Sequence, residues 1–376
     1  MTLFPMTKAS IGLSLSRDSL CLVEIKRRWG GIHCRHIAGQ QLPPNTLRLS
    51  PAKLNIENPE EFNRCIRDLL RDLTPPRGIA LSLPDLCGRT TVLTFTSFPT
   101  QKTEQDSIVR WRFQQDMNVS TDNSRFAYSI LKPSTQPGEP THVLATAVQH
   151  NIIEQYEQAC LEVGLLPNSV GLAGLDIFDF YRSHVQEISG GSKQQRSNTS
   201  QECLFLYLAD WGFSFMAFRQ GCPTFVRVKA LPISRLQYAD DRSEEAQDSS
   251  LFNPEHSDKK PLTPPTANEQ YSVADTTKVS NEIVATLQYY FETLQHAREE
   301  DYRIPLYFAE GLRLGETLLP TEQVIQEALQ LSMPHPPLLT MQRFSDKMSR
   351  KMKQAILNSE PQMASASALA SVMVVS

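Results

Sequence analysis

Apolar residues in the first ninety positions follow the spacing of three strands, a helix and a further strand. Strands are predicted over residues 10–15, 20–26, 32–38 and 78–84. Between the third and fourth strands, Phe62, Ile66 and Leu69 recur at helical spacing from residue 59 onward, and Pro75-Pro76 ends that helix. Strands followed by a helix and a returning strand predict a mixed α/β sheet covered by helices.

A compact unit is expected next in the chain. The pattern predicts strands over 91–96, 126–131 and 142–148 and helices over 103–117 and 152–163. Gly164 follows the last helix and suits the left-handed backbone that commonly ends helices. A strand near 170–172 and a helix over 176–185 then return to the first sheet. We interpret residues 90–165 as a subdomain inserted into a first lobe that covers residues 8–188.

A linker and a second lobe follow. Residues 189–201 are rich in Gly, Ser, Gln and Asn and lack apolar periodicity, which predicts a linker. The second lobe, residues 202–360, begins with a three-strand meander. Its elements are predicted over 204–210, 213–218, 224–228, 279–294, 306–309, 323–329 and, as a basic helix, 344–357. Residues 237–275 contain few large apolar side chains and are predicted to be a disordered insertion.

The composition is that of an ordinary folded protein, with 40% apolar and 21% charged residues in a chain of 376. This length exceeds the size at which one hydrophobic core stops growing, so two lobes are expected. The formal net charge of −4 predicts no nucleic-acid partner. The seven cysteines include no Cys-x-x-Cys pair, and Cys34 with His36 does not complete a zinc site, so no metal is expected.

The chain is expected to work in the cytosol. Its first residues lack the apolar stretch of a signal peptide, and its longest uncharged stretch, 361–376, is interrupted by serines and is shorter than a membrane span. The predicted basic helix over 344–357 is either a solvated face of a packed helix, which we favour, or a contact to anionic lipid.

The order of these elements resembles the PilM family of type IV pilus assembly proteins. The matching stretches are residues 11–26, 79–85, 109–131, 143–176, 206–227, 280–291 and 364–375. FtsA-like division proteins and the cytoplasmic domain of GspL are similar in fold, but Val109-Arg110-Trp111 favours PilM. The resemblance implies an α/β, two-lobed actin-like ATPase fold with a PilM-type subdomain inserted in the first lobe. It also implies that residues 361–376 form a helix that packs on the first lobe.

In the actin-like ATPases that this chain resembles, each lobe presents a hairpin turn to the nucleotide. A glycine lets backbone N–H groups approach a phosphate, and an aspartate orients magnesium. Where the family has Asp-x-Gly in the first hairpin, this chain has Ser14-Leu15-Ser16. Ser14 and Ser16 can still form hydrogen bonds to a phosphate, but neither brings charge to a divalent cation. A plain hairpin without a ligand is the alternative interpretation.

The second hairpin keeps Asp210-Trp211-Gly212-Phe213-Ser214, in which the resemblance assigns Asp210, Gly212 and Ser214 to phosphate. The ring of Phe213 would crowd a phosphate unless it turned away. Asp210 is also a common residue at turns, so a structural role is equally open.

The expected adenosine-binding glycine pair appears as Glu310-Gly311, and Glu282 lies on the preceding helix, where it faces either the same cleft or solvent. We therefore expect a vestigial nucleotide site, with no required cofactor and weak or absent binding of ATP and magnesium. No meaningful hydrolysis is expected, because positioning and electrostatic stabilisation supply nearly all of the acceleration in phosphoryl transfer.

In PilM-like proteins the inserted subdomain and the groove beside it hold the short cytoplasmic amino-terminal peptide of the membrane protein PilN. By resemblance, the same surface here includes Val109, Trp111, Phe113, Met117, Phe126 and Tyr128. Val109, Phe113 and Met117 share one helical face, which favours packing on the subdomain's own sheet. Trp111 lies off that face and is the better contact to a partner.

The sequence therefore favours a non-catalytic scaffold that serves a type IV pilus, an MSHA-type system or a related secretion assembly. Its expected partners are the PilN-like peptide and other assembly components, which would hold it at the cytosolic face of the bacterial inner membrane. The alternative is an active actin-like ATP-binding protein, ATPase or kinase with an atypical site. A division anchor like FtsA is disfavoured, because the serine-rich tail is not an amphipathic membrane helix.

Overall fold

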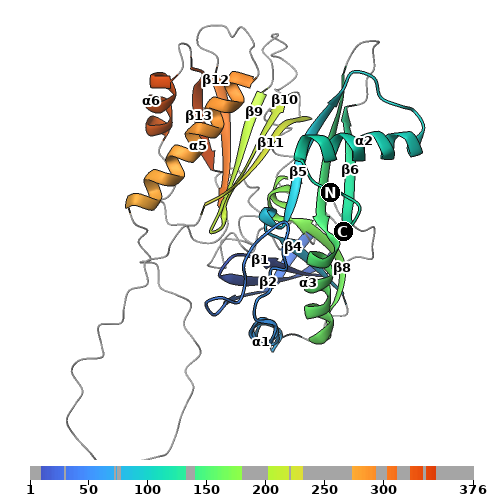
Figure 1. Cartoon of the computed structure of the whole chain (residues 1–376). Helices are drawn as coiled ribbons and strands as arrows, with labels where there is room; N and C mark the ends of the chain where they lie inside the picture. Colours follow the sequence, from blue (N-terminus) through green and yellow to red (C-terminus); the bar gives the residue numbers. More distant parts are fainter. Residues whose placement is uncertain are drawn as a thin grey trace, which may run out of the picture.

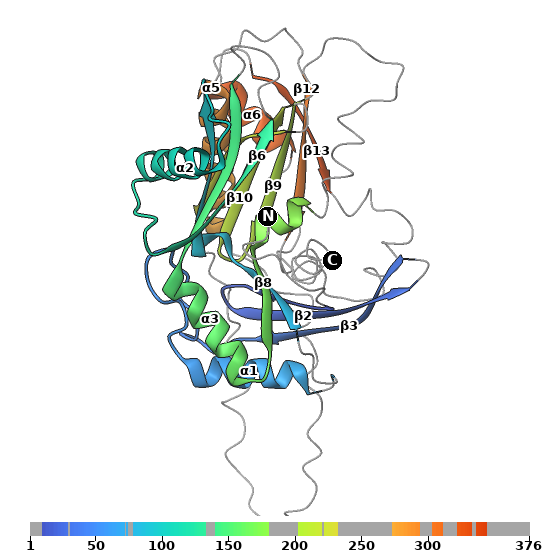
Figure 2. The same ribbon diagram turned by 90° about the vertical axis from the view of Figure 1, so that its right-hand side faces the viewer.

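The structure of the chain, a computed structural model, contains two five-stranded sheets and one three-stranded sheet, with helices packed beside them (Figures 1 and 2). It describes residues 10–28, 31–71, 73, 78–132, 140–179, 202–219, 222–231, 273–293, 303–310, 322–332 and 336–343. Each five-stranded sheet forms the centre of one lobe. The three-stranded sheet belongs to a subdomain that lies within the first lobe's stretch of chain.

The first lobe is built on a sheet with the strand order β3-β2-β1-β4-β8. Its strands are β1 (Ile11–Leu15), β2 (Ser19–Arg28), β3 (Gly31–Gln41), β4 (Gly78–Leu83) and β8 (Leu166–Leu172). The first three strands form an antiparallel meander, whereas β4 runs parallel to β1, and β8 runs parallel to β4. All five residues of β1 are buried, as expected for a central strand covered on both faces.

The inserted subdomain is a three-stranded antiparallel sheet with the order β5-β7-β6 and one helix. Its elements are β5 (Gly88–Phe95), α2 (Lys102–Met117), β6 (Ser124–Lys132) and β7 (Thr141–Gln149). Helix α2 lies across one face of the sheet (Figure 1), where Val109 and Phe113 pack with Leu93 and Val143 in a separate small core. The subdomain therefore has a hydrophobic core of its own.

Helix α3 (His150–Glu162) follows β7 but packs on the first lobe, against β8 and helix α1 (Pro59–Leu70). The range 90–165 expected for the inserted subdomain includes this helix, whereas the three-stranded sheet and α2 end at residue 149. The difference arises because the apolar side of α3, including Ile152 and Tyr156, joins the first lobe's core. The expected cap is confirmed: Gly164 adopts φ +82° directly after the helix.

The second lobe repeats the layout of the first, with the strand order β11-β10-β9-β12-β13. Its elements are β9 (Glu202–Ala209), β10 (Gly212–Arg219), β11 (Cys222–Ala230), α5 (Val273–Thr293), β12 (Arg303–Glu310), α6 (Glu322–Ser332) and β13 (Leu338–Arg343). Again an antiparallel meander is extended by parallel strands on the side of its first strand. Leu204, Leu206 and Leu208 of β9 face a core shared with α5 and α6.

The opposite face of the second sheet packs against the first lobe, so the two lobes share one hydrophobic core. Phe205, Tyr207 and Phe218 belong to the same cluster as the strands of the first lobe. The ring of Phe178, in the helical residues 173–179 that follow β8, stacks on Phe218 with ring centroids 4.2 Å apart. Strand β11 also lies beside β5 of the inserted subdomain.

Several expected elements fall outside the described residues. These are the linker 189–201, residues 237–272 of the predicted insertion, the basic helix 344–357 and the tail 361–376. Helix α5 begins at Val273 and so includes the last three residues of the range that was predicted to be disordered. Strand β13 was not predicted: its six residues extend the sheet parallel to β12.

Candidate functional site

The turn between β1 and β2 binds a carboxylate from the second lobe. Ser16 Oγ donates to Asp210 Oδ1 at 2.5 Å, and the backbone N–H of Arg17 donates to the same carboxylate, with N···O distances of 3.2 and 3.1 Å. The N–H of Asp18 donates to Asp210 Oδ2 at 3.3 Å. The turn itself is closed by a bond from the Ser16 N–H to the Ser19 carbonyl. One hydroxyl and two consecutive N–H groups therefore converge on Asp210.

Asp210 is held in position by a tight turn between β9 and β10. Gly212, two residues after Asp210, has φ +139°, a backbone conformation that residues with a side chain rarely adopt. A Cβ on Gly212 would lie 2.0 Å from the carbonyl oxygen of Lys229 in β11. The close approach of β11 thus requires glycine at position 212, whether or not a ligand binds at this turn.

A second carboxylate, Asp85 of the first lobe, accepts a hydrogen bond from the second lobe. It lies in a short 3-10 helix, η1 (Asp85–Cys87), directly after β4, and accepts the hydroxyl of Ser214 from β10 at 2.5 Å. It also accepts the N–H of Gly174, at 3.1 and 2.9 Å. Burial raises the pKa of Asp85 to about 6, although the bonds from Ser214 and Gly174 favour its charged form.

Gly174 allows these groups to meet. A Cβ at this position would lie 2.5 Å from Asp85 Oδ2 and 3.0 Å from Ser214 Cβ. A third buried acid lies nearby in the same helical segment: Asp176 accepts the hydroxyl of Ser82, the penultimate residue of β4, at 2.8 Å. Burial raises the pKa of Asp176 as well. Three aspartates thus lie where the strands of the two lobes end.

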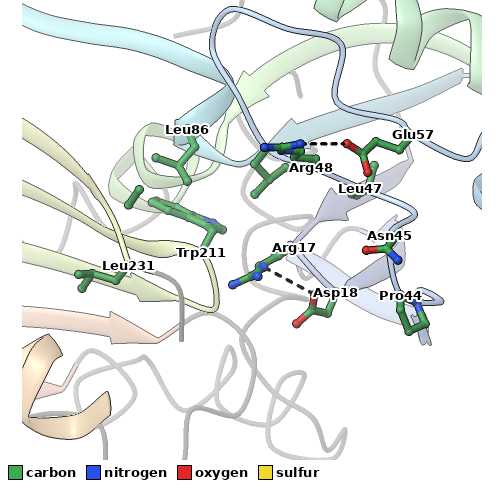
Figure 3. A pocket seen from close by; sticks show the side chains of 12 residues that line it. Arg17, Asp18, Pro44, Asn45, Leu47, Arg48, Glu57, Leu86, Trp211 and Leu231 are labelled. Atoms are coloured by element: carbon green, nitrogen blue, oxygen red, sulfur yellow. Dashed lines mark ion pairs between the residues drawn. The ribbon is translucent and has the colours of Figure 1, made fainter. Parts of the chain in front are cut away.

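Beside the turn lies a cleft of about 550 Å³ that both lobes line. Figure 3 shows Trp211 and Leu231 on one side, Arg17 near the centre, and the loop after β3 on the other side. Arg17 and Arg48 are each within 4 Å of one acid, Asp18 at 3.9 Å and Glu57 at 3.8 Å. The lining combines these charged side chains with leucines and Trp211, so the cleft is mixed in character.

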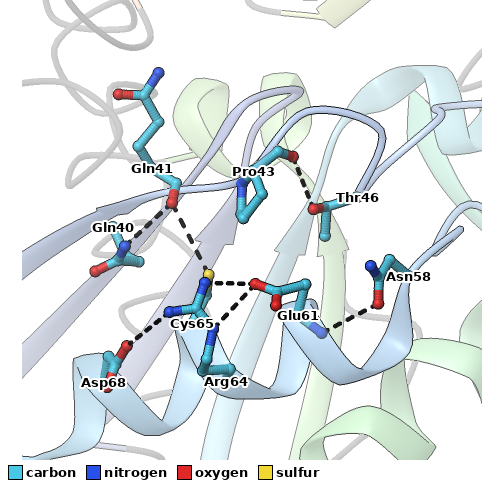
Figure 4. Close-up of polar contacts among 9 residues, drawn as sticks. All are labelled: Gln40, Gln41, Pro43, Thr46, Asn58, Glu61, Arg64, Cys65 and Asp68. Atoms are coloured by element: carbon cyan, nitrogen blue, oxygen red, sulfur yellow. Dashed lines mark hydrogen bonds and ion pairs between the residues drawn. The ribbon is translucent and has the colours of Figure 1, made fainter.

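The loop that forms the far wall of this cleft is fixed at both ends (Figure 4). At its start, the hydroxyl of Thr46 donates to the carbonyl of Pro43 at 2.7 Å. At its end, Asn58 caps α1 by accepting the N–H of Glu61 at 3.2 Å. The thiol of Cys65 in α1 donates to the last carbonyl of β3, which ties the helix to the sheet. The wall is therefore anchored on both sides.

The remaining residues assigned to a nucleotide are used within the protein or lie apart. Ser14 is buried in β1, opposite Cys21 and Ser82 in the neighbouring strands. Glu282 of α5 forms an ion pair with Lys229 of β11 at 2.8 Å. Glu310 is the last residue of β12, and its side chain, like the whole of Gly311, lies outside what the structure describes.

In this structure, the groups that the resemblance assigns to phosphate and magnesium contact other groups of the protein. The donors of the first turn already bind Asp210, Ser214 binds Asp85, and the magnesium-facing position holds Ser14 in a buried strand. Phe213 turns away from the cleft into the core of the second lobe. Within the described ranges, no three His, Cys, Asp or Glu side chains are placed to hold a metal ion.

The six residues assigned to a partner peptide divide into two groups. Val109 and Phe113 are buried in the subdomain's core, with Met117 packed partly against it, as their helical spacing predicted. Trp111 is 57% exposed. It lines a shallow cavity of about 520 Å³ on the outer side of α2. The other lining residues are Pro99, Thr103, Glu104, Ser107 and Ile108.

Phe126 and Tyr128 of β6 face α2 and are partly covered by its side chains. The guanidinium of Arg110 lies 4.8 Å from the centre of the Phe126 ring, and Lys102 lies 4.1 Å from the centre of the Tyr128 ring. The Tyr128 hydroxyl donates to Asp106 at 2.5 Å. These two aromatic residues therefore help to attach α2 to the sheet, and Trp111 is the one aromatic side chain of the six that is largely exposed.

The sequence did not identify Asp85, Gly174 and Asp176 as residues of the site. A signal for Asp85 was present, because an acid directly after a short buried strand lies at the carboxyl end of that strand. Nothing in the sequence indicated that Ser214 would bind it, since the two residues are 129 positions apart. Among the described residues, no helix combines the length and apolar character needed to cross a membrane.

Compared with known protein families and with curated proteins, the sequence shows no match. Among solved structures, the PilM-PilN type IV pilus biogenesis complex is similar over 99% of both chains, with a TM-score of 0.62 and 16% identity. An actin-like ATPase fold protein of unknown function from Bacteroides thetaiotaomicron matches over 94% of this chain and 96% of its own, with a TM-score of 0.41 and 10% identity.

The cytoplasmic domain of EpsL, an inner membrane component of the type II secretion system of Vibrio cholerae, matches over 87% of this chain and 96% of its own. Its TM-score is 0.37 and its identity 9%. The likeness to the PilM-PilN structure establishes the fold. The predicted fold class, a two-lobed actin-like α/β fold with an inserted subdomain in the first lobe, is confirmed.

Proposed function

We propose that this chain is a non-catalytic scaffold of a type IV pilus or related secretion assembly. In this role it binds the short cytoplasmic amino-terminal peptide of a PilN-like inner-membrane protein, which holds it at the cytosolic face of the membrane. The observation that supports the proposal is the full-length likeness to the PilM-PilN structure. Because the match covers 99% of both chains, it includes the inserted subdomain and is not confined to the sheets common to many actin-like proteins.

The proposed contact surface is the outer side of α2. Trp111 is exposed beside Ile108, and large aromatic side chains in such positions commonly supply much of the binding energy at an interface. Val109 and Phe113 act indirectly, because their burial fixes the helix that presents Trp111. Glu104 at the edge of the same cavity favours a basic side chain in the partner peptide.

A binding measurement tests this surface. The probe is a synthetic peptide that corresponds to the cytosolic amino terminus of the proposed partner, a PilN-like single-pass membrane protein of the same organism. We expect Trp111→Ala to weaken its binding by at least about tenfold without lowering the melting temperature. Leu161→Ala, which removes another half-exposed apolar side chain far from α2, is the matched control. Equal peptide affinity of Trp111→Ala and the unchanged protein would contradict the proposed surface.

We further propose that the protein does not hydrolyse ATP. Support comes from Ser14, which replaces the expected carboxylate, and from Asp210, whose carboxylate is already bonded to the first turn. Melting temperatures with and without ATP and magnesium test this directly, because tight binding to the folded state must raise the melting temperature. A magnesium-dependent increase would favour the alternative, an active actin-like ATPase or kinase.

A double variant tests whether changes in the first hairpin alone account for the loss of nucleotide binding, or whether the rest of the cleft has changed as well. Ser14→Asp with Ser16→Gly restores the residue types that the first hairpin has in the resembling family. If the rest of the cleft retains its nucleotide-binding shape, this variant should gain magnesium-dependent stabilisation by ATP. We expect no gain, since Asp210 and Glu282 are held by other groups of the protein.

A further inference from the structure

The turn between β1 and β2 has the form of an anion-binding site. Successive backbone N–H groups that point to one side, assisted by a hydroxyl, form a concave group of donors that binds oxyanions in many proteins. Here Ser16, Arg17 and Asp18 supply such donors, and all of them reach the same carboxylate, Asp210. The anion therefore comes from the chain itself, from the opposite lobe.

The second contact between the lobes reverses these roles. Ser214 of the second lobe donates to Asp85 of the first lobe, whereas Ser16 of the first lobe donates to Asp210 of the second. Both carboxylates and both serines are buried. Each lobe thus contributes one carboxylate and one hydroxyl, and the two bonds cross the interface in opposite directions.

We propose that the turn formed by residues 16–18 is an oxyanion-binding site whose ligand is the chain's own Asp210 carboxylate. Together with the Asp85–Ser214 contact, this bond joins the two lobes beside the cleft when no phosphate is bound. Free inorganic phosphate competes for the same donors, because it presents oxygens of the same kind. The inference holds whichever partner binds α2, so it does not rest on the proposed peptide interaction.

Two features favour the internal carboxylate over free phosphate. Asp210 is attached to the same chain, so its effective concentration at the turn exceeds that of a dilute ligand. The position of Asp210 is also fixed in advance, because the tight turn at Gly212 leaves it little conformational freedom to lose on binding. A phosphate must displace this carboxylate before it reaches the donors.

The contact also determines the shape of the neighbouring cleft. Arg17 and Asp18, whose N–H groups bind Asp210, line the cleft of about 550 Å³ from the first lobe. Trp211, the residue after Asp210, lines it from the second lobe. When the carboxylate leaves the turn, the two walls lose the bond that joins them beside the cleft, while the shared core still holds the lobes together. The cleft is therefore kept in one form by a bond within the protein and not by a nucleotide.

Hydrogen exchange of the Arg17 and Asp18 amides in the full chain tests the proposal. In the unchanged protein both amides should exchange slowly, and Asp210→Ala should accelerate them by at least about tenfold, as expected when a bond to a charged acceptor is lost. Millimolar inorganic phosphate should slow exchange again in Asp210→Ala, but have little effect on the unchanged protein. Asp122→Ala, which removes an exposed acid before β6, is the matched control.

If Asp210→Ala destabilises the whole fold, exchange becomes faster throughout α3. In that case Ser16→Ala is used instead. This variant removes one donor and leaves both amides and Asp210 in place, so it should accelerate exchange at Arg17 and Asp18 while α3 stays protected. Rapid exchange of these amides in the unchanged protein overturns the proposal. The proposal is also overturned if phosphate slows exchange of the Arg17 and Asp18 amides equally in the unchanged protein and in Asp210→Ala. Peptide binding at Trp111 is a separate measurement, and its failure leaves these outcomes unaffected.

Discussion

The turns that follow β1 and β9 occupy equivalent places in the two lobes, yet they have opposite chemical roles. The first turn presents donors, from Ser16, Arg17 and Asp18, whereas the second presents the acceptor, Asp210. In proteins that bind a nucleotide between two such turns, both face a phosphate. Here one turn binds the other. A pair of turns suited to enclosing an anion can therefore serve as a contact between two lobes.

The largest effect is expected from the glycine of the second turn. Gly212→Ala should destabilise the protein by about 4 kcal/mol, since it combines an unfavourable backbone conformation with a clash against the Lys229 carbonyl. Chemical denaturation measures the difference. Gly39→Ala in β3 is the control, because a Cβ there meets nothing closer than 3.9 Å. Similar losses in both variants would show that the tight turn has no special requirement.

Removal of the acceptor should have the next largest effect. Asp210→Ala leaves one hydroxyl and two N–H groups of the first turn without the carboxylate, and we expect a loss of about 3 kcal/mol in the free energy of unfolding. Asp122→Ala should change stability by less than about 0.5 kcal/mol, as is usual for an exposed residue. A loss for Asp210→Ala as small as that of the control would contradict the contact.

Substitution of each serine tests whether the Ser16–Asp210 and Ser214–Asp85 hydrogen bonds contribute equally to the free energy of unfolding. Ser16→Ala and Ser214→Ala should each cost about 1–2 kcal/mol, because each removes one hydroxyl donor to a buried carboxylate. Ser129→Ala, at an exposed position of β6, provides the baseline. A cost confined to one of the two serines would reduce the proposed pair of contacts to a single one.

The smallest effect concerns pH. The pKa of Asp85 rises from 3.8 in the unfolded chain to about 6 in the folded protein, because burial disfavours its charge. A raised acid pKa means that the folded state holds the proton more tightly, so this group's contribution to stability is full below about pH 4. It is lost as the pH rises to about 6.

Asp85→Asn should therefore remove this pH dependence and be about 1 kcal/mol more stable than the unchanged protein at pH 7.5. The other titratable groups that face Asp85 are Cys87, Asp176 and Tyr207. Cys87 and Tyr207 stay neutral in this range. The charge of Asp85 also raises the pKa of Asp176, so the comparison is repeated in an Asp176→Asn background, in which the remaining difference between the stability curves belongs to Asp85. Parallel curves from pH 4 to 7 would contradict the assignment.

Most of the fold could be predicted because its strands are short apolar runs bounded by turn residues. β1, β9 and β10 are examples, and so is α2, whose residues Val109 and Phe113 recur at helical spacing. β13 could not be predicted in this way, since Leu338–Arg343 is short and carries both polar and apolar residues. It is a strand because it pairs with β12, whose residues lie 35 positions earlier in the chain at every register pair.

Three positions of the candidate site were predictable, but their contacts were not. The resemblance led to Ser16, Asp210 and Ser214, and all three lie at the interface between the lobes. Their partners were not predictable, because a bond between Ser16 and Asp210 depends on how the sheets of the two lobes approach each other. The pattern along the chain carries no information about that approach, and the same holds for Asp85 and Gly174.

The stacked rings of Phe178 and Phe218 have a consequence for how the molecule can be divided. A chain cut between residues 179 and 202 would give two fragments, each with an uncovered apolar sheet face or helix. Neither fragment is expected to be soluble alone, and the pair should regain the native form only when mixed. Recombination of one lobe with the other lobe of a distant relative should fail for the same reason, so the two lobes are constrained to change together.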